Sequence, residues 1–124
     1  MSNVIYPDEV VTSALIREVD LSAFGATGKL ALITIDNGMD HTRPTTLGPQ
    51  SIQNISKAID DALALNPAAV AITGKPFILA AGADLSGITA LTNKEDAASI
   101  IKWGHDAYRK LRESKIPTFC FVRW

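Results

Sequence analysis

The sequence predicts an α/β layered fold, and three observations favour this class. From residue 29 onward, β-rich runs and amphipathic helical stretches follow one another in the order strand, helix, strand, strand, helix, strand. The run at 69–73 is short and continuously apolar, as expected for an interior strand. No internal repeat and no low-complexity linker interrupts the 124 residues, so we expect one domain with one core.

The first half of the chain contains two predicted strands and one helix. Residues 1–9 are expected to form a flexible terminus, followed by a strand at 10–19 and a glycine-containing turn at 21–28. The β-rich run KLALITID at 29–36 predicts a second strand, which completes an N-terminal hairpin. After a loop at 37–47, apolar residues recur on one face of a helix at 49–65, with Pro49 in its first turn.

The second half predicts three more strands and the longest helix. The strand at 69–73 is followed by a turn at 74–76 and a short strand at 77–80. Residues 84–88 are typical of a turn or a short helix. Thr92 and Glu95 have the spacing of a capping box, which predicts that the long helix begins at Thr92. Ile116-Pro117 ends that helix, and 118–122 is expected to be a buried strand.

Composition excludes several functional classes. The chain has 12 basic and 13 acidic residues, so no basic field is available to attract nucleic acid or a membrane surface. One cysteine excludes an internal disulfide and fits a reducing compartment. No secretory signal and no run of membrane-spanning length is present, so we expect a cytoplasmic protein without membrane or nucleic-acid partners.

The segment most suited to bind a substrate is Ala80-Ala81-Gly82-Ala83-Asp84. Its side chains offer almost no chemistry, so any function depends on the backbone, which small residues allow a ligand to approach. If a helix begins at Asp84 or Leu85, the free N–H groups of its first turn can receive an oxyanion. The alternative from composition alone is an ordinary turn between a strand and a helix.

The run FILAAGADL at 77–85 resembles the first oxyanion-hole segment of the crotonase (enoyl-CoA hydratase/isomerase) superfamily. The resemblance extends from about residue 29 to 122. It is closest to the hydratase part of bacterial multifunctional proteins that also contain 3-hydroxyacyl-CoA dehydrogenase. It implies a crotonase-like spiral of ββα units, of which this chain is the N-terminal part. Periodicity alone fits a doubly wound sheet about as well.

The resemblance also implies a binding site for acyl-CoA. It assigns the N–H of Ala83 to the oxyanion hole, where it binds the thioester carbonyl oxygen, and places the carbonyl of Ala81 beside the adenine of coenzyme A. An Arg-Pro loop implies that Arg43 meets a phosphate, although a solvated loop arginine is an equal alternative. The substrate-binding residues implied in full are Arg43, Thr45, Thr46, Ala81, Gly82, Ala83, Asp84 and Leu85. Here Leu47-Gly48-Pro49 follows the loop in place of the usual Asn-Ala-Leu, which weakens the assignment of Thr45 and Thr46.

The other reactive side chains favour structural roles. Asp84 is expected to be a cap or a turn acceptor. His41 and His105 have no carboxylate or cysteine arrangement around them, so no metal site is predicted. Cys120 lies between Phe119 and Phe121 in a predicted interior strand, which indicates an inert buried thiol.

The resemblance places the remaining catalytic groups after Val122. These are an Asn-Gly pair, a triple-glycine turn with the second oxyanion N–H, and two glutamates, none of which this sequence contains there. We therefore expect a partial, truncated crotonase-like domain over 1–124, whose family reaction is hydration of a 2-enoyl-CoA in fatty-acid β-oxidation and which is inactive alone. A coenzyme A thioester is the implied substrate, no bound cofactor is implied, and a homo-oligomer, in the family a trimer, is expected. The alternative is a non-catalytic protein that binds coenzyme A thioesters or associates with crotonase subunits.

Overall fold

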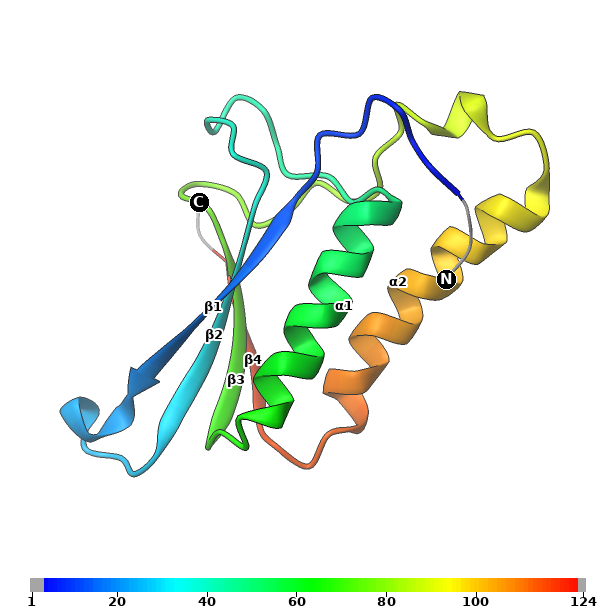
Figure 1. The fold of residues 1–124 in the computed structure, drawn as a ribbon. Coiled ribbons are helices and arrows are strands. Elements are labelled where there is room, and N and C mark those ends of the chain that lie inside the picture. Colours follow the sequence, from blue (N-terminus) through cyan, green and yellow to red (C-terminus); the bar gives the residue numbers. More distant parts are fainter. Residues whose placement is uncertain (1–3, 123–124) are drawn as a thin grey trace.

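The fold is a four-stranded sheet with two long helices (Figure 1). The computed structural model describes residues 4–122, apart from the side chain of Ala90. The sheet order is β1-β2-β3-β4, with β1 antiparallel to β2 and the other pairs parallel. In chain order the elements are β1 (Ser13–Asp20), a 3₁₀ turn (Leu21–Phe24), β2 (Lys29–Asp36), α1 (Pro49–Ala64), β3 (Ala69–Gly74), a 3₁₀ turn (Ile88–Ala90), α2 (Lys94–Glu113) and β4 (Thr118–Phe121).

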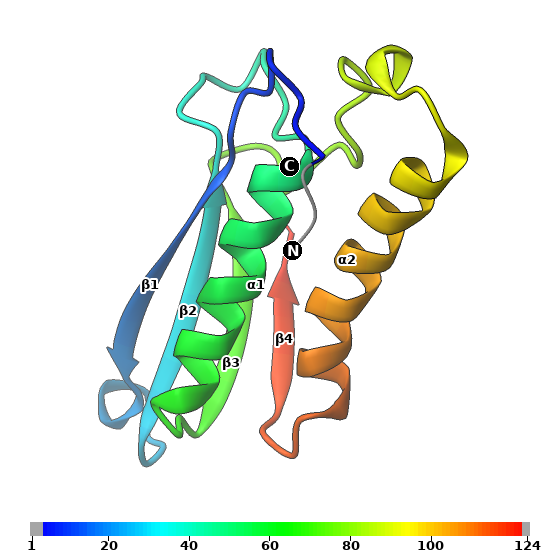
Figure 2. The same ribbon diagram turned by 45° about the vertical axis from the view of Figure 1, so that its right-hand side comes forward.

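Both helices lie on one face of the sheet, as Figures 1 and 2 show. The strand order advances in one direction from β2 to β4, and right-handed crossovers then place α1 and α2 on the same side. A doubly wound sheet needs helices on both faces, so the described residues exclude that alternative and confirm the α/β class. Neither described helix is long and apolar enough to cross a bilayer.

The core lies between this face and α1. Alternate residues of β2 point to opposite faces, and those that meet the helices, including Ile33 and Ile35, are buried. Ile55 and Ile59 on α1 pack against them at helical spacing, which confirms the predicted apolar face. The buried cluster consists of Ala31, Ile33, Ile35, Ile55, Ala58, Ile59, Ala62, Val70 and Ile72.

The strand β4 was expected to be buried, and this expectation is wrong. It forms the edge of the sheet, and Phe119 and Phe121 are 53% and 50% exposed. Cys120 is also exposed, so the prediction of a buried thiol fails for the same reason. Although its residues are apolar, β4 stays exposed, because among the described residues only β3 and part of α2 lie beside it.

Residues 77–80 do not form the predicted strand. Gly74 ends β3, and the chain turns at Phe77, whose φ of 75° lies in the left-handed region. An extended strand needs a negative φ, so the apolar run continues instead as an irregular segment toward Ala83. The helix α2 begins two residues later than predicted, because Asn93, not Thr92, caps it by accepting a hydrogen bond from the Asp96 N–H.

The described part of the N-terminal segment packs against α1. Tyr6 is 6% exposed and contacts Ile52 and Ile100. The Glu9 carboxylate accepts hydrogen bonds from the N–H groups of Gln50 (3.1 Å) and Ser51 (2.9 Å). Gly48 offers no side chain to cap α1, so a residue about 40 positions earlier satisfies the first helical N–H groups. Residues 4–9 therefore hold specific positions, although a flexible terminus was expected over 1–9; Met1, Ser2 and Asn3 lie outside the described residues.

Replacing Glu9 tests this long-range cap. Glu9→Ala leaves two helical N–H groups without their acceptor, and we expect the free energy of unfolding to fall by about 0.5–2 kcal/mol. Denaturant unfolding measures the change, with Asp8→Ala, an exposed neighbour, as the matched control. Equal stability of both variants would contradict the cap.

Candidate functional site

The candidate site lies where two loops leave the sheet at the carboxyl ends of neighbouring strands. The strands β2 and β3 are parallel, so their carboxyl ends lie side by side. The loop after β2 therefore runs beside the segment that follows β3 (Figure 1). In open α/β sheets, ligands bind at the carboxyl ends of the strands. The sheet topology thus brings the Arg43 loop and the alanine-glycine segment together.

Three main-chain hydrogen bonds join these two segments. The Ala81 N–H donates to the Thr45 carbonyl over 2.7 Å, and the Leu47 N–H donates to the Gly82 carbonyl over 2.9 Å. The Asp84 N–H then donates to the Leu47 carbonyl over 3.1 Å. The result is an isolated parallel bridge between Leu47 and Ala83.

This pairing determines the direction of the Ala83 N–H. In a parallel bridge the residues on either side of Ala83 bond to Leu47, so the N–H and carbonyl of Ala83 itself point away from it. Ala83 is exposed, and no acceptor within residues 4–122 bonds to its N–H. Gly82 has φ +101°, a value that side-chain-bearing residues rarely adopt, so a glycine is required there. The bridge therefore leaves the Ala83 N–H available to a ligand.

The donor does not come from a helix, contrary to one expectation. No helix begins at Asp84 or Leu85; a turn leads into the 3₁₀ turn at Ile88–Ala90. The Asp84 carboxylate accepts from the N–H (2.9 Å) and hydroxyl (2.6 Å) of Ser86, which confirms its role as a turn acceptor. Burial raises the pKa of nearby Tyr6, and the charge of Asp84 raises it further.

The other predicted binding residues surround this bridge in different ways. Arg43 is exposed, and together with Thr46 and Asp84 it lines a smaller cavity of about 280 Å³ with mixed polar and apolar walls. Thr45 is fully buried, and its hydroxyl has no hydrogen-bond partner among the described residues. Its contact with the alanine-glycine segment is the main-chain hydrogen bond that its carbonyl accepts from Ala81. Leu85 is 70% exposed.

An apolar cavity of about 450 Å³ begins where the same segment passes over the sheet. Leu79 and Ala80 line it, and they lie four and three residues before Ala83 in the sequence. Its volume is within the range of small-molecule sites. Ile35, Ile72, Thr118 and Cys120 line it from the helix-covered face of the sheet, and Tyr108 and Leu111 line it from α2. Phe119, between Thr118 and Cys120 in β4, completes the lining. Burial raises the pKa of Tyr108, so the phenol stays neutral in this wall.

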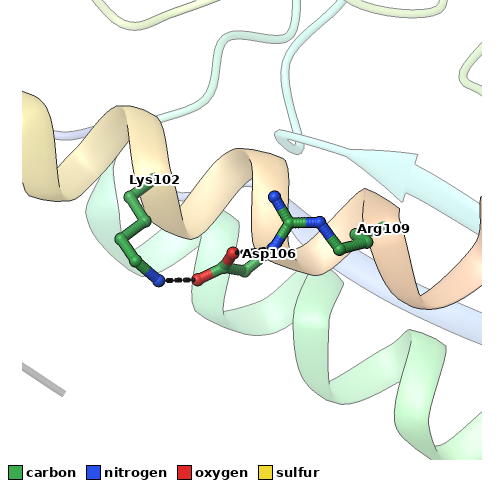
Figure 3. A network of polar contacts seen from close by, with 3 residues as sticks. All are labelled: Lys102, Asp106 and Arg109. Carbon is green, nitrogen blue, oxygen red and sulfur yellow. Dashed lines mark hydrogen bonds and ion pairs between the residues drawn. The ribbon is translucent and has the colours of Figure 1, made fainter.

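Charged clusters elsewhere do not form an acid/base site. On α2 the Asp106 carboxylate accepts from Lys102 (2.6 Å) and Arg109 (2.8 Å), a network that faces solvent (Figure 3). A carboxylate neutralised by two cations is a poor base. Within residues 4–122, no three histidine, cysteine or acidic side chains gather as metal ligands. His41 instead packs edge-on against Phe77, with ring centroids 5.5 Å apart.

Sequence reasoning missed Lys75, which it placed in a simple turn. The Lys75 side chain is buried and contacts the Arg43 loop. A lysine between Gly74 and Pro76 gives no periodic signal of burial, so the sequence offers no means of finding it.

Neither a family model nor a curated protein matches the chain. Solved structures do match. A probable enoyl-CoA hydratase of Mycobacterium tuberculosis is 23% identical with a TM-score of 0.66, covering 86% of this chain and 40% of its own. Enoyl-CoA hydratase from Thermoplasma volcanium is 14% identical with a TM-score of 0.73, covering 97% and 43%. A putative enoyl-CoA hydratase/isomerase (crotonase) from Legionella pneumophila is 17% identical with a TM-score of 0.70, covering 90% and 40%.

These likenesses establish the fold. The chain has the crotonase-type α/β fold over the part that matches, which confirms the predicted fold class. It spans about two fifths of the length of the solved chains that it matches. At identities below 25%, the activity of those proteins does not transfer to this chain.

Gly74→Ala is expected to disturb the site. A Cβ at Gly74 would lie 2.5 Å from the Ile78 carbonyl oxygen and 2.6 Å from the Leu79 Cα, so the segment leading to Ala83 must shift. We expect a loss of about 1–3 kcal/mol in the free energy of unfolding. The matched control is Gly104→Ala on α2, where an added Cβ would lie 3.9 Å from Ile52 Cδ1, an ordinary van der Waals contact. That variant should gain about 0.5–1 kcal/mol from helix propensity, and a loss of similar size in both would contradict the crowding at Gly74.

The network on α2 predicts an acid-side loss of stability. The hydrogen bond from Lys102 lowers the pKa of Asp106, and the charge of Arg109 lowers it further. A lowered pKa means that the stabilisation is fully present above the ordinary aspartate pKa and is lost as the pH falls through the folded-state value. The difference in unfolding free energy between the natural chain and Asp106→Asn should therefore shrink to nothing with acidification. A difference that stays constant with pH would contradict this role of the carboxylate.

Proposed function

We propose that this chain supplies the first half of a thioester-binding site, with the Ala83 N–H donating to the carbonyl oxygen of an acyl-CoA or enoyl-CoA. One observation carries the proposal: the bridge to Leu47 turns this N–H away from its neighbours and leaves it exposed without an acceptor among the described residues. An oxyanion forms on that oxygen when an enoyl thioester is attacked or an acyl thioester is deprotonated. A fixed donor of this kind can contribute about 2.7–4 kcal/mol to lowering the barrier.

The two cavities fit the two ends of such a ligand. The apolar cavity beside Leu79 and Ala80 suits an acyl chain. Arg43, which lines the smaller cavity, suits a phosphate of coenzyme A, because a guanidinium forms paired hydrogen bonds with phosphate oxygens. The remaining proposed ligand contacts are Thr45, Thr46 and the segment from Ala81 to Leu85. The Ala81 carbonyl is the proposed contact for the adenine of coenzyme A. No bound cofactor is required.

The family reaction that this site supports best is hydration of a 2-enoyl-CoA, as in fatty-acid β-oxidation. The solved proteins with this fold include enoyl-CoA hydratases, which supports the choice of substrate class. The finer assignment, to the hydratase part of a multifunctional protein with 3-hydroxyacyl-CoA dehydrogenase, rests on the sequence resemblance. We propose a cytoplasmic setting because the single cysteine fits a reducing compartment.

The 124-residue chain on its own is proposed to bind the thioester without turning it over. Hydration needs a group that moves a proton beside the polarised carbonyl. Asp84 is the nearest carboxylate in sequence, and Ser86 already occupies it with two hydrogen bonds. The solvent-facing Asp106 network lies on another element.

The surface of the sheet favours a second role, association with crotonase-type subunits or with copies of itself. Cys120 lies opposite Ile72 in the register, so Phe119 and Phe121 project from the face that the helices leave uncovered. Leu15 adds to this face and is 63% exposed. Exposed apolar groups of this kind mark contact surfaces, and a homotrimer is the proposed assembly.

Vibrational spectroscopy tests the thioester contact directly. With crotonyl-CoA labelled with ¹³C at its thioester carbonyl, we expect the carbonyl band to move to lower frequency on binding, because hydrogen bonding weakens the C=O bond. Replacing Ala83 with its α-hydroxy acid analogue removes only the N–H and should abolish the shift. The same replacement at Ile88, whose N–H donates to the Leu85 carbonyl outside the bridge, should preserve the shift. A shift that survives at Ala83, or no binding in calorimetric titration, would overturn the proposal.

A hydratase assay separates binding from catalysis. Purified chain is expected to bind acetoacetyl-CoA in calorimetry and to leave crotonyl-CoA unhydrated. Turnover at the rate of an intact hydratase would contradict the proposed inactivity. Turnover that appears only after mixing with a full-length crotonase subunit would support the association role instead.

A further inference from the structure

Lys75 has an unusual environment for a lysine. It follows β3 directly, and the residue is 5% exposed. Its Nζ donates to four oxygens: the Asn37 Oδ1 (2.6 Å) and the carbonyls of Met39 (2.9 Å), Asp40 (2.9 Å) and Arg43 (2.7 Å). An ammonium group has three protons, so it is fully hydrogen-bonded and shares at least one of them.

These acceptors are neutral oxygens from a single loop. Within residues 4–122, no carboxylate oxygen lies at ion-pairing distance from the Lys75 Nζ. Asp36 and Asp40 line a small cavity together with Lys75, but neither carboxylate pairs with it. Burying a charge without such compensation is costly, so the four oxygens must replace water around the ammonium. They surround the cation much as backbone carbonyls surround a bound monovalent cation.

The same loop leads directly to the proposed site. The Asn37 side chain, which accepts from Lys75, also donates to the carbonyls of Arg43 (3.1 Å) and Pro44 (3.2 Å). The next carbonyl along the chain, that of Thr45, accepts the N–H of Ala81. Lys75 and Asn37 therefore hold the loop immediately before the residues that form the bridge to Ala83.

We propose that Lys75 is a positioning residue that holds the 37–44 loop, and with it Arg43, beside the thioester-binding segment. It acts through the loop and does not touch the ligand. This inference rests on the proposed function for its effect on binding, while its effect on the loop can be measured without any ligand. Removing the ammonium leaves four carbonyl-type oxygens facing one another, so the loop must move or admit water or another cation.

Hydrogen exchange measures the loop directly. In Lys75→Ala, amides of the 38–43 segment should exchange at least about tenfold faster, because the loss of hydrogen bonds to a charged group removes that much protection. Propylammonium, which replaces the missing part of the side chain, should restore protection, whereas 1-propanol should not. The matched control is Lys57→Ala, an exposed lysine on α1 paired with Asp61. Unchanged exchange in Lys75→Ala, or equal rescue by 1-propanol, would overturn the proposal.

Ligand affinity tests the connection to Arg43. Calorimetric titration with acetoacetyl-CoA should show about tenfold weaker binding in Lys75→Ala and in Arg43→Ala, and no further loss in the double variant. Additive losses would overturn action through Arg43. If the natural chain does not bind the thioester, the proposed function fails, and the exchange experiment still decides whether Lys75 holds the loop.

A second variant covers the case in which Lys75→Ala fails to fold. Asn37→Ala removes one acceptor of Lys75, the acceptor of the Met39 N–H (3.0 Å) and both donated hydrogen bonds, and it leaves Lys75 its three carbonyls. It should raise exchange in the same loop amides. In the natural chain, the Lys75 ammonium protons should exchange slowly enough to be observed by ¹⁵N NMR at neutral pH. Rapid exchange of those protons together with unchanged loop protection in Asn37→Ala would overturn the proposal.

Discussion

The pairing of Thr45–Leu47 with Ala81–Asp84 is the interaction on which the candidate site depends. Three main-chain hydrogen bonds fix two irregular segments that no helix or sheet would otherwise order. They use the amides of Ala81 and Asp84 and leave that of Ala83 exposed between them. A backbone donor held in this way costs no side-chain entropy on binding, because its direction is set by the fold.

The sheet topology explains why these segments meet. Because β2 and β3 are parallel neighbours, the loops that follow them leave the sheet at the same end. The crossover connection from β2 to β3 contains α1. Long-range polar contacts then hold the pieces: Glu9 caps α1, and Lys75 holds the loop before Thr45. Gly74 and Gly82 are glycines for local reasons, since the first has no room for a Cβ and the second has a positive φ.

The elements with strong periodicity were predictable from the sequence. The strand β2 matches the predicted residues, and α1 ends one residue before its predicted end. The alternation in KLALITID and the spacing of Ile52, Ile55 and Ile59 indicate which side of each element is buried. The run at 77–80 was not predictable, because its apolar residues resemble a strand while a left-handed Phe77 breaks it. The burial of β4 was overestimated, because an apolar sequence does not say how many neighbours a strand has.

The candidate site was predictable in its residues and not in its geometry. The small residues around Gly82 indicated a backbone site, and the role of Asp84 as a turn acceptor followed from its residue type. The donor comes from a parallel bridge and not from a helix, because Asp84 N–H bonds to Leu47, which lies 37 positions earlier in the sequence. Lys75 and Glu9 act over similar separations, and single-sequence patterns carry no record of such pairs.

The central claim is that the Ala83 N–H receives the oxygen of a thioester. Titration of ¹⁵N-labelled chain with acetoacetyl-CoA, followed by amide NMR, tests this most directly. We expect the Ala83 amide proton to move strongly downfield as it gains a hydrogen bond, while that of Ala81, already bonded to Thr45, changes little. An Ala83 amide that keeps its position while the ligand binds elsewhere would contradict the account.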